Sequence, residues 1–569
     1  MSVGRWWRPA AAALTGGLLA AAFPPLETAE AAWFALAPLL WIARGSSVRA
    51  AFAWGWGAGF LFWLLTLAWL LRLVAAGGPL LAVAAGWLLL AAYCALYLGL
   101  FAAVAAWLLG GGEAQGTAAE SGWHRLGAAL ALPLVWVGLE YGRATLFTGF
   151  AWNPLGVSQY RNLAIIQLAE WGGVYAVSAL VLLMNAALAL TAFRLADVYR
   201  RRCPPRRHAE LMVALLATAL ALGWGVRARL QAARREAAGA ELRVAAVPLN
   251  VPQRQKWDEA AADAIYERLA ELTRQAQRHA PDLIVWPETA VPYCARTDPR
   301  TRAFVEELAA EGTAILAGSM EVAAAPDGRG PDRYYNSSLL FLPGQGLAEL
   351  YRKRHLVPFG EYVPGDRWWP WLARFSPLGV SCSAGATSTV FRLPLAPRAQ
   401  PSPAAGGAAA AFPRPPAAFS ALICFEDTIA PLAREAVRNG ARLLINQTND
   451  GWFEGSAAAV QHLSHGVFRC VENRVPAVRC ANLGATCFID SAGRIDRMSL
   501  ELLTEDGGAG IEYRTDAVRL PPADWTPTFY TRYGDAAFAA PCGLLAALGV
   551  AAAAWRARRE RTTGKGENP

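Results

Sequence analysis

The stretch with the clearest capacity for chemistry is an apolar run, Phe419–Ile423, that ends in the thiol of Cys424. A carboxylate, Glu426, follows two residues later. A buried strand that delivers a cysteine to its tip, next to charged groups, is one way in which a fold presents a nucleophile. A lone cysteine is otherwise most often a core residue, because free cysteine is among the most buried residue types. The rest of the chain has to decide between these two interpretations.

Two further stretches favour chemistry. The apolar run Leu283–Trp286 leads through a proline to Glu288. The stretch Tyr351–Glu361 places Lys353 between a strand-like segment and a loop that contains proline and glycine. Together the three stretches offer a base, a cation and a thiol, which is a set of groups suited to covalent acyl transfer.

The elements that must position these groups follow from the apolar pattern. Strands are predicted at 241–248, 282–286, 313–318, 335–341, 419–424, 442–446, 477–481 and 486–490, and helices at 258–279, 301–311, 429–439 and 458–473. Strands that alternate with helices imply an α/β layered domain. The segment Pro394–Pro416 is rich in alanine, proline and glycine, so we predict a mobile loop insertion without a chemical role.

Composition divides the 569 residues into unlike parts. Hydrophobic residues make up 55% of the chain and charged residues only 17%, and the apolar excess lies at its two ends. We predict a transmembrane bundle of seven spans over 1–230 and a catalytic domain over 237–525 with a flexible insertion at 394–416. A final transmembrane helix over 534–556 and a basic cytoplasmic tail over 557–569 complete the prediction.

Eight apolar stretches approach the roughly 20 residues that a membrane-spanning helix needs. They are Pro9–Phe23, Ala31–Ile42, Ala50–Leu73, Leu80–Leu109, Leu126–Tyr141, Gly172–Phe193, Leu211–Val226 and Ala536–Trp555. The first two are short and could form one helical hairpin. The polar segment Thr148–Gln167 is predicted either as an interfacial loop or as a re-entrant segment that helps lipid to reach a site.

Arginine clusters indicate the orientation, because loops on the cytoplasmic side carry an excess of positive charge. With eight spans, four groups of basic residues all lie on one side: Arg5 and Arg8, Arg44 and Arg49, the arginines near 200–207, and those from Arg556 onward. The link around Glu113 and Glu120 has little positive charge. The predicted catalytic domain then lies on the opposite, non-cytoplasmic side.

The net charge of +9 is explained by these arginines, so we do not expect nucleic-acid binding. The nine cysteines show no zinc-like spacing and the chain has no glycine-rich phosphate loop, so neither a metal nor another cofactor is expected. Cysteines on the non-cytoplasmic side leave disulfide pairing open, but we predict that Cys424 stays free, because pairing would block its chemistry. The other cysteines on that side are Cys294, Cys382, Cys470, Cys480 and Cys487.

The three motifs resemble those of the nitrilase superfamily, which uses glutamate, lysine and cysteine together. This resemblance covers about Glu241 to Pro521 and implies an α-β-β-α sandwich. The longer string His355–Pro364, together with the spans on both sides, makes the whole chain resemble the apolipoprotein N-acyltransferase family of bacteria.

The resemblance implies roles for single residues. Glu288 would act as base, Lys353 as the cation that stabilises an oxyanion and Cys424 as the acyl carrier. Glu361 resembles a second essential acid, and its alternative is a loop carboxylate paired with Arg354 or His355.

Four other residues match positions that line the family's active site. For the two tryptophans among them, core packing is the alternative. Phe425 departs from the pattern, because an aromatic residue with a hydroxyl is commoner there. The four matching residues are Trp257, Asn336, Glu426 and Trp452.

The implied reaction moves an acyl chain from a phospholipid to the amine of the diacylglyceryl cysteine of an apolipoprotein, through a thioester with ping-pong kinetics. The implied location is the bacterial inner membrane, with the catalytic domain on the periplasmic side, and we expect a monomer. Aromatic residues around Tyr362–Leu378 (Trp368, Trp369, Trp371, Phe375) favour a lipid-facing mouth. The alternatives are a membrane-tethered amidase and a lipid transporter without enzymatic activity.

Overall fold

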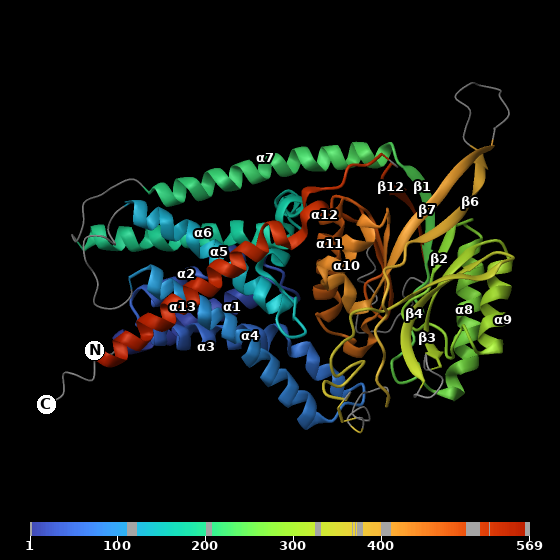
Figure 1. Cartoon of the computed structure of the whole chain (residues 1–569), viewed down its shortest axis with the longest axis horizontal. Coiled ribbons are helices and arrows are strands. Elements are labelled where there is room, and N and C mark those ends of the chain that lie inside the picture. The colour runs from blue at the N-terminus through green and yellow to red at the C-terminus, as the bar shows by residue number, and fades with distance from the viewer. Residues whose placement is uncertain are drawn as a thin grey trace. The chain divides into compact units, whose positions relative to one another are not determined.

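The structure, a computed structural model, describes residues 3–110, 122–200, 208–324, 332–366, 368–369, 371, 379–399, 411–496, 513–522 and 524–563. Two compact units make up the chain (Figure 1). The helical unit comprises Met1–Leu230, Ser456–Phe468 and Thr528–Pro569, and the α/β unit comprises Gln231–Gly455 and Arg469–Pro527. The predicted features around Glu113 and Glu120, at Phe375 and in the last residues of the basic tail lie outside the described residues.

The helical unit is built from long apolar helices with short 3₁₀ segments between them. Its longer helices are α1 (Val3–Ala21), α3 (Val48–Thr66), α4 (Leu80–Leu108), α5 (Gly122–Thr145), α6 (Ala169–Tyr199), α7 (Ala209–Ala237) and α13 (Ala539–Thr563). The shorter ones are η1 (Ala29–Trp33), α2 (Ala37–Arg44), η2 (Ala68–Val74), η3 (Leu155–Gln159), η4 (Ile165–Leu168), α12 (Phe529–Tyr533) and η10 (Gly534–Ala537). Helix α7 continues past Leu230 into the α/β unit.

The predicted number of about eight spans is not confirmed. Among the described residues, five helical segments are long and apolar enough to cross a membrane: Val48–Thr66, Leu80–Leu108, Ile165–Tyr199, Ala209–Ala237 and Phe529–Glu560. The predicted span Ala31–Ile42 is instead the short η1 followed by α2 of eight residues. A helix of that length covers about 12 Å, far less than a bilayer core of about 30 Å.

Glycine allows the closest helix contacts in the helical unit. A Cβ added to Gly55 of α3 would lie 2.5 Å from the Ala102 Cβ of α4, and one added to Gly138 of α5 would lie 2.1 Å from the Cys542 oxygen of α13. In a bilayer the hydrophobic effect does not drive helices together, because lipid tails are as apolar as the side chains. Small residues favour helix association instead, because they let the backbones approach closely.

Gln461, on α11 (Ala458–Asn473), is a hydrogen-bonding centre of the helical unit. Its Oε1 accepts hydrogen bonds from the indole N–H groups of Trp69 (3.1 Å) and Trp152 (2.8 Å). Its Nε2 donates to the carbonyl oxygens of Pro24 (2.9 Å) and Thr66 (3.2 Å). The predicted catalytic domain included this helix, yet residues 456–468 belong to the helical unit.

The polar segment Thr148–Gln167 is packed rather than exposed at its centre. Arg143 Nη1 donates to the carbonyl oxygens of Phe150 (2.7 Å) and Trp152 (2.6 Å). Glu140 Oε1 accepts from the backbone N–H of Leu155 at 2.6 Å. Two charged side chains of α5 therefore hold the irregular backbone in place of a regular helix.

The α/β unit contains two six-stranded sheets. The first has the order β12-β1-β2-β3-β4-β5 and the second the order β11-β10-β9-β8-β7-β6. The strands are β1 (Ala240–Ala246), β2 (Leu283–Val285), β3 (Ala314–Ala323), β4 (Arg333–Leu342), β5 (Gly346–Arg352), β6 (Phe391–Ala399), β7 (Ala411–Ile423), β8 (Leu444–Asn449), β9 (Ala477–Asn482), β10 (Cys487–Ile489), β11 (Ile495–Asp496) and β12 (Arg514–Leu520). The helices are α8 (Ala262–Gln277), α9 (Pro299–Ala310) and α10 (Ala430–Arg438), with 3₁₀ segments η5 (Glu259–Ala261), η7 (Cys424–Thr428) and η8 (Asp450–Phe453).

The alternation of apolar residues along the strands produces two cores. Leu242 and Val244 of β1 face the core between the sheets, which they share with residues of the second sheet such as Phe419. Ala245 and Val247 face the other way, toward α8 and α9. With α10 against β7 on the second sheet, the layers form the predicted α-β-β-α sandwich (Figure 1).

The prediction of a loop over Pro394–Pro416 is partly wrong. Its described ends continue β6 and β7, which pair antiparallel at Leu395 with Arg414 and at Arg398 with Phe412. The register shifts twice along this pair. Prolines are tolerated here because β6 is an edge strand and the proline-rich part of β7 pairs with β6 alone. Residues 400–410 lie outside the described residues.

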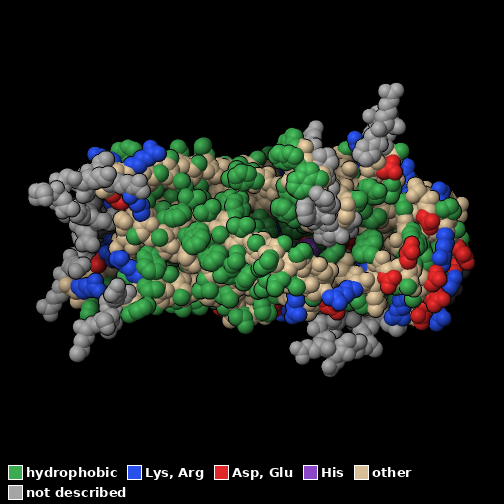
Figure 2. All heavy atoms as spheres, turned by 90° about the horizontal axis from the view of Figure 1, so that it is seen from below, with side chains coloured by type: hydrophobic (Ala, Val, Ile, Leu, Met, Phe, Trp, Pro, Cys, Tyr) green, Lys and Arg blue, Asp and Glu red, His purple; other side chains and the backbone are tan. Residues whose placement is uncertain are grey.

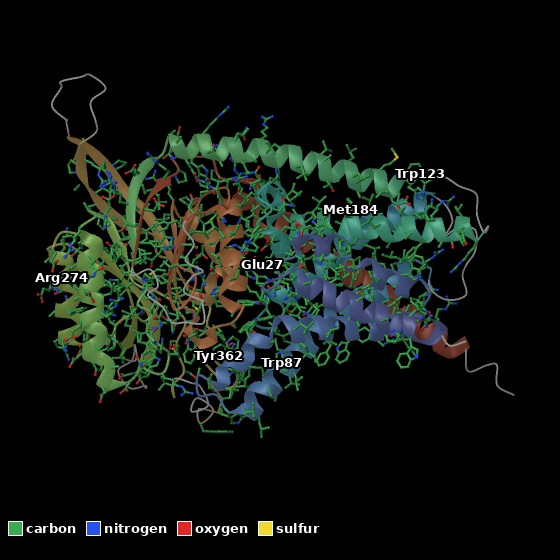
Figure 3. The ribbon with its side chains drawn as sticks, turned by 180° about the vertical axis from the view of Figure 1, so that it is seen from behind. Glu27, Trp87, Trp123, Met184, Arg274 and Tyr362 are labelled. Carbon is green, nitrogen blue, oxygen red and sulfur yellow. The ribbon has the colours of Figure 1, made fainter. Side chains whose placement is uncertain are left out.

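The surfaces of the two units differ in composition. Hydrophobic side chains cover the helical unit on the face in Figure 2, whereas acidic and basic side chains gather on the α/β unit. In the α/β unit, Arg274 lies on the outer face of α8 (Figure 3), where its Nε is 2.9 Å from Oε1 of Glu311. Such a mixed, charged exterior is that of an ordinary water-exposed domain.

Candidate active site

Strand direction gathers the predicted residues at one end of the sandwich. Strands β1, β2 and β3 run parallel, as do β7, β8 and β9. Glu288 follows β2 and Cys424 follows β7, so both lie beyond the carboxyl ends of parallel strands. Lys353 follows β5, which runs in the same direction as β3 because two antiparallel steps separate them. In layered α/β folds this is the end at which ligands bind.

Glu288 sits in a tight turn after β2 and is 7% exposed. The buried Trp286 anchors the turn through an indole hydrogen bond to Thr273 Oγ1 at 3.0 Å. Gly318 of β3 is required beside it, because an added Cβ would lie 2.1 Å from the Pro287 oxygen. Thr289 has a positive φ of 45°, which a threonine adopts only under constraint.

Lys353 lies between two carboxylates and is 1% exposed. Its Nζ is 2.9 Å from Oε1 of Glu361 and 3.7 Å from Oε1 of Glu288. Burial disfavours the charged ammonium, but the charges of Glu361, Cys424 and Glu288 outweigh it and raise the pKa of Lys353 above its usual value. The lysine is therefore a permanent cation in this site.

Asn336 connects the two carboxylates. Its Nδ2 donates to Oε1 of Glu288 at 2.7 Å and to Oε1 of Glu361 at 3.1 Å. Its main-chain oxygen accepts from the N–H of Lys353 at 2.8 Å. One buried residue of β4 thus orients the candidate base, the candidate cation and the second acid together.

Glu361 does not take the alternative partners considered from the sequence. Besides Lys353, it accepts a hydrogen bond from the backbone N–H of Val357 at 2.9 Å. The guanidinium of Arg354 instead pairs with Glu435 at 2.9 Å. Glu361 is therefore part of the lysine's surroundings rather than a loop carboxylate.

Cys424 begins η7 in a strained backbone conformation, with φ +53°. Its main-chain oxygen accepts from Asn446 Nδ2 at 3.0 Å, which holds the turn at the end of β7. The residue is partly exposed. Burial of its thiol is the largest cause of a raised pKa, the charge of Glu288 adds to it, and the charge of Lys353 opposes it. The resting thiol thus keeps its proton and needs a base.

Glu426 is fully buried and saturated with donors. It accepts from the hydroxyl of Tyr351 at 2.9 Å and from the backbone N–H groups of Ile423 (2.8 Å), Arg354 (2.7 Å) and His355 (3.1 Å). Burial raises the pKa of its carboxyl, and these hydrogen bonds work against the rise. The carboxylate joins the turn of Cys424 to the loop of Lys353.

The aromatic candidates have different surroundings. Trp257 is 45% exposed, so core packing does not explain it, and Trp452 is partly buried. Phe425, where a hydroxyl was expected, stacks on His355 with ring centroids 6.0 Å apart. The ring therefore supports the lysine loop through its face.

A second charged cluster lies behind Cys424. Arg479 of β9, 2% exposed, binds Asp427 and Asp450, each at 2.9 Å. Its Nη1 also donates to Oδ1 of Asn446 at 2.8 Å, the residue that holds the Cys424 carbonyl. One arginine thus ties η7 to the ends of β8 and β9.

The sequence analysis missed Lys256, which is 4% exposed. Its Nζ donates to the main-chain oxygen of Glu288 at 2.7 Å. A signal was present: lysine occurs only at positions 256, 353 and 565 in a chain otherwise rich in arginine. A rare residue type that appears twice in one domain indicates a requirement that arginine does not meet.

Among the described residues no group of three or more histidine, cysteine or acidic side chains could hold a metal ion. The eight described cysteines, Cys424 included, are free thiols. The site therefore presents a thiol, two carboxylates and two ammonium groups within one buried end of the sandwich, an arrangement suited to acyl transfer by a covalent route.

Two protein-family models match parts of the chain. Residues 243–545 match the carbon-nitrogen hydrolase family, and residues 15–187 match the apolipoprotein N-acyltransferase N-terminal domain. Among solved structures, Nit3 of Saccharomyces cerevisiae, a nitrilase-superfamily member, is 19% identical. It covers 49% of this chain and 90% of its own, with a TM-score of 0.34.

Relatives narrow the class further. Apolipoprotein N-acyltransferase of Geobacter metallireducens is 38% identical over 96% of this chain and 95% of its own. That of Bordetella bronchiseptica is 32% identical over 98% of each chain. The chain belongs to the apolipoprotein N-acyltransferase family, within the carbon-nitrogen hydrolase superfamily, and is a membrane-associated acyltransferase.

Proposed function

We propose that the protein transfers an acyl chain from a phospholipid to the N-terminal amine of the diacylglyceryl cysteine of apolipoproteins. The observation that carries this proposal is the meeting of Lys353 with Glu288 and Glu361 at the strand end that also presents Cys424. All of these groups come from one chain, which supports a site that works in a monomer. The names of the relatives support the lipoprotein acceptor.

The first half-reaction forms a thioester on Cys424. Glu288 accepts the thiol proton, and the sulfur attacks the ester carbonyl of the phospholipid. Lys353 stabilises the oxyanion of the tetrahedral intermediate, a contribution that typically lowers a barrier by about 3–4 kcal/mol. The C–O bond then breaks, and Glu288 returns the proton to the departing lysophospholipid oxygen.

The second half-reaction moves the acyl chain to the amine. The neutral amine of the acceptor attacks the thioester, and Glu288 takes its proton. The C–S bond breaks, an amide forms, and the proton returns to the sulfur. Glu361 and Asn336 keep Lys353 in place through both steps. One site that serves two substrates in turn predicts ping-pong kinetics.

Both substrates are lipids, which gives the helical unit a purpose. Its apolar helices would hold the chain in the bilayer, and the exposed Trp368, Trp369 and Trp371 of the α/β unit would face lipid. Counted over the eight predicted spans, the arginine distribution supports a bacterial inner-membrane location with the catalytic domain over 237–525 on the periplasmic side and residues 557–569 in the cytoplasm.

Mass spectrometry of the purified protein tests the reaction. With phospholipid alone, an acyl mass should appear on the peptide that contains Cys424 and should be absent in Cys424→Ala. A diacylated lipopeptide should then gain a third chain on its amine. Release of free fatty acid without amide formation would indicate a hydrolase, and an unmodified cysteine would indicate a non-enzymatic protein.

Labelling of whole cells tests the orientation. A membrane-impermeant maleimide should label Arg274→Cys, on the exposed face of α8, and should leave Arg556→Cys unlabelled. The unsubstituted protein provides the background from native cysteines. The reverse pattern would place the α/β unit in the cytoplasm and contradict the proposal.

A further inference from the structure

Lys256 is delivered to the candidate site by a tightly held turn after β1. Val251 and Asn482 exchange two hydrogen bonds, one from the Val251 N–H (2.9 Å) and one from Asn482 Nδ2 (3.0 Å). Gln253 Oε1 accepts from Asn449 Nδ2 at 2.7 Å. The turn is thus fastened to the carboxyl ends of β8 and β9, and its lysine points into the buried end of the sandwich.

Lys256 contacts the turn that carries the candidate base. Its ammonium donates to the carbonyl oxygen of Glu288 at 2.7 Å, directly before the strained Thr289. Two charged groups act on it: the Glu288 carboxyl in the loop after β2 and the Cys424 thiol at the start of η7. A buried ammonium is costly unless an opposite charge offsets it.

Two lysines, Lys353 and Lys256, act on the Glu288–Cys424 pair, and they differ in their other partners. Lys353 and Glu361 form one ion pair. Under the proposed function, Glu288 and Cys424 share one proton and carry one negative charge between them, whichever group holds the proton. Lys353 also lies 3.7 Å from the Glu288 carboxylate, but its closer partner, at 2.9 Å, is Glu361. Lys256 interacts with both Glu288 and Cys424 and adds a positive charge that Glu361 does not already offset.

We propose that Lys256 is a positioning residue that holds the Glu288 turn through its carbonyl and serves as the counter-cation of the Glu288–Cys424 pair. This inference rests on the proposed function for its assignment of the shared proton. The proposal explains why this position is a lysine. The buried ammonium donates to a single carbonyl, which suits a compact group, whereas a guanidinium would present five donors.

The proposal has a pH signature. Burial lowers the pKa of Lys256 to about 8, against the opposing charges of Glu288 and Cys424. The ammonium is therefore charged below that pH and loses its charge as pH rises through it. Its support of the Cys424 thiolate should be present at neutral pH and should fade on the alkaline side.

Alkylation of Cys424 by iodoacetamide, followed by mass spectrometry of its peptide from the full-length protein, measures this support without any acyl substrate. We expect Lys256→Met to react on the order of tenfold to a hundredfold more slowly at pH 7, as for loss of a nearby unit charge at an effective dielectric constant of about 20. The difference from wild type should shrink above pH 8. Lys256→Arg should keep more reactivity than Lys256→Gln, which retains only a donor.

Arg254→Met is the matched control, because it removes a positive charge from the exposed part of the same turn and should leave the profile unchanged. A folded Lys256→Met that is alkylated like wild type at every pH would overturn the proposal. If that variant does not fold, equal profiles for Lys256→Gln and Lys256→Arg would overturn it. If the wild-type protein transfers acyl chains but substitution of Lys256 leaves the alkylation profile unchanged, this inference alone is wrong. If the substitution shifts the profile but the wild-type protein shows no acyl transfer, only the proposed function is wrong.

Discussion

Asn185 and Arg143 of the helical unit satisfy their buried polar groups differently from Lys353 and Arg479 of the α/β unit. In the helical unit, Asn185 Nδ2 donates to the Ala32 carbonyl at 2.8 Å, and Arg143 donates to two main-chain carbonyls. In the α/β unit, Lys353 and Arg479 are bonded to carboxylates instead. Hydrogen bonds to the backbone fix how helices pack, whereas opposed charges create a set of groups whose protonation can change. The difference indicates where the chain maintains structure and where it can do chemistry.

The largest expected effect is at the ion pairs of the candidate site. Among the described residues, Lys353 is the only cationic side chain that is bonded to both Glu288 and Glu361, and Lys353→Met removes it. We expect acyl transfer to fall on the order of a hundredfold to a thousandfold, as for loss of an oxyanion donor. Single-turnover acylation of Cys424 measures it. Arg354→Met, which loses a partly exposed pair with Glu435, is the control, and equal rates for both variants would contradict the assignment.

The next effect concerns stability in the same unit. Arg479→Met removes the buried cation that Asp427 and Asp450 share, which should lower the free energy of unfolding by about 3–5 kcal/mol. Denaturant unfolding measures this change. Arg494→Met removes two ion pairs of an exposed arginine, with Asp490 and Asp496, and should cost less than about 1 kcal/mol. Equal stability of the two variants would show that the buried ion pairs of Arg479 do not stabilise the α/β unit more than exposed pairs do.

A smaller effect is expected where neutral hydrogen bonds replace charges. Gln461→Leu leaves the indole N–H groups of Trp69 and Trp152 without this acceptor. Each unmet buried donor costs about 1–3 kcal/mol, and relaxation within the helical unit should keep the total near the lower value. Thermal unfolding in detergent checks this, with Gln275→Leu, at a partly exposed position, as control. A loss larger than that of Arg479→Met would reverse the comparison.

The smallest effect is a change in acid sensitivity. Burial favours the neutral form of Glu321, but the hydrogen bonds and charges of Arg352 and Arg296 outweigh it and lower its pKa. A depressed carboxyl pKa contributes stability above the unfolded value of about 4.3, and this stability is lost as pH falls through the folded value. Glu321→Gln should therefore flatten the decline of unfolding free energy between about pH 5 and pH 3. An unchanged slope would show that the arginines do not hold the ionised form.

Local sequence signals predicted most of the α/β unit. Alternation along residues 241–248 and 282–286 correctly indicated strands with two apolar faces, because strand period depends on neighbouring residues alone. Where the prediction was wrong, tertiary pairing decided. The proline-rich ends of 394–416 became strand because β6 lies at a sheet edge. The apolar run 31–42 is not a span because the helix is interrupted within it: η1 ends at Trp33 and α2 begins only at Ala37.

The sequence by itself determined which chemistry the chain can carry: a glutamate, a lysine and a cysteine at the ends of predicted strands, flanked by apolar spans. Only the tertiary structure decided the partners of these groups. In the fold, Glu361 pairs with Lys353, Glu426 accepts hydrogen bonds from backbone N–H groups, and Lys256 binds the carbonyl of the Glu288 turn. These contacts depend on how the ends of the two sheets pack together. The local sequence around each residue does not indicate which distant residues will contact it in the fold.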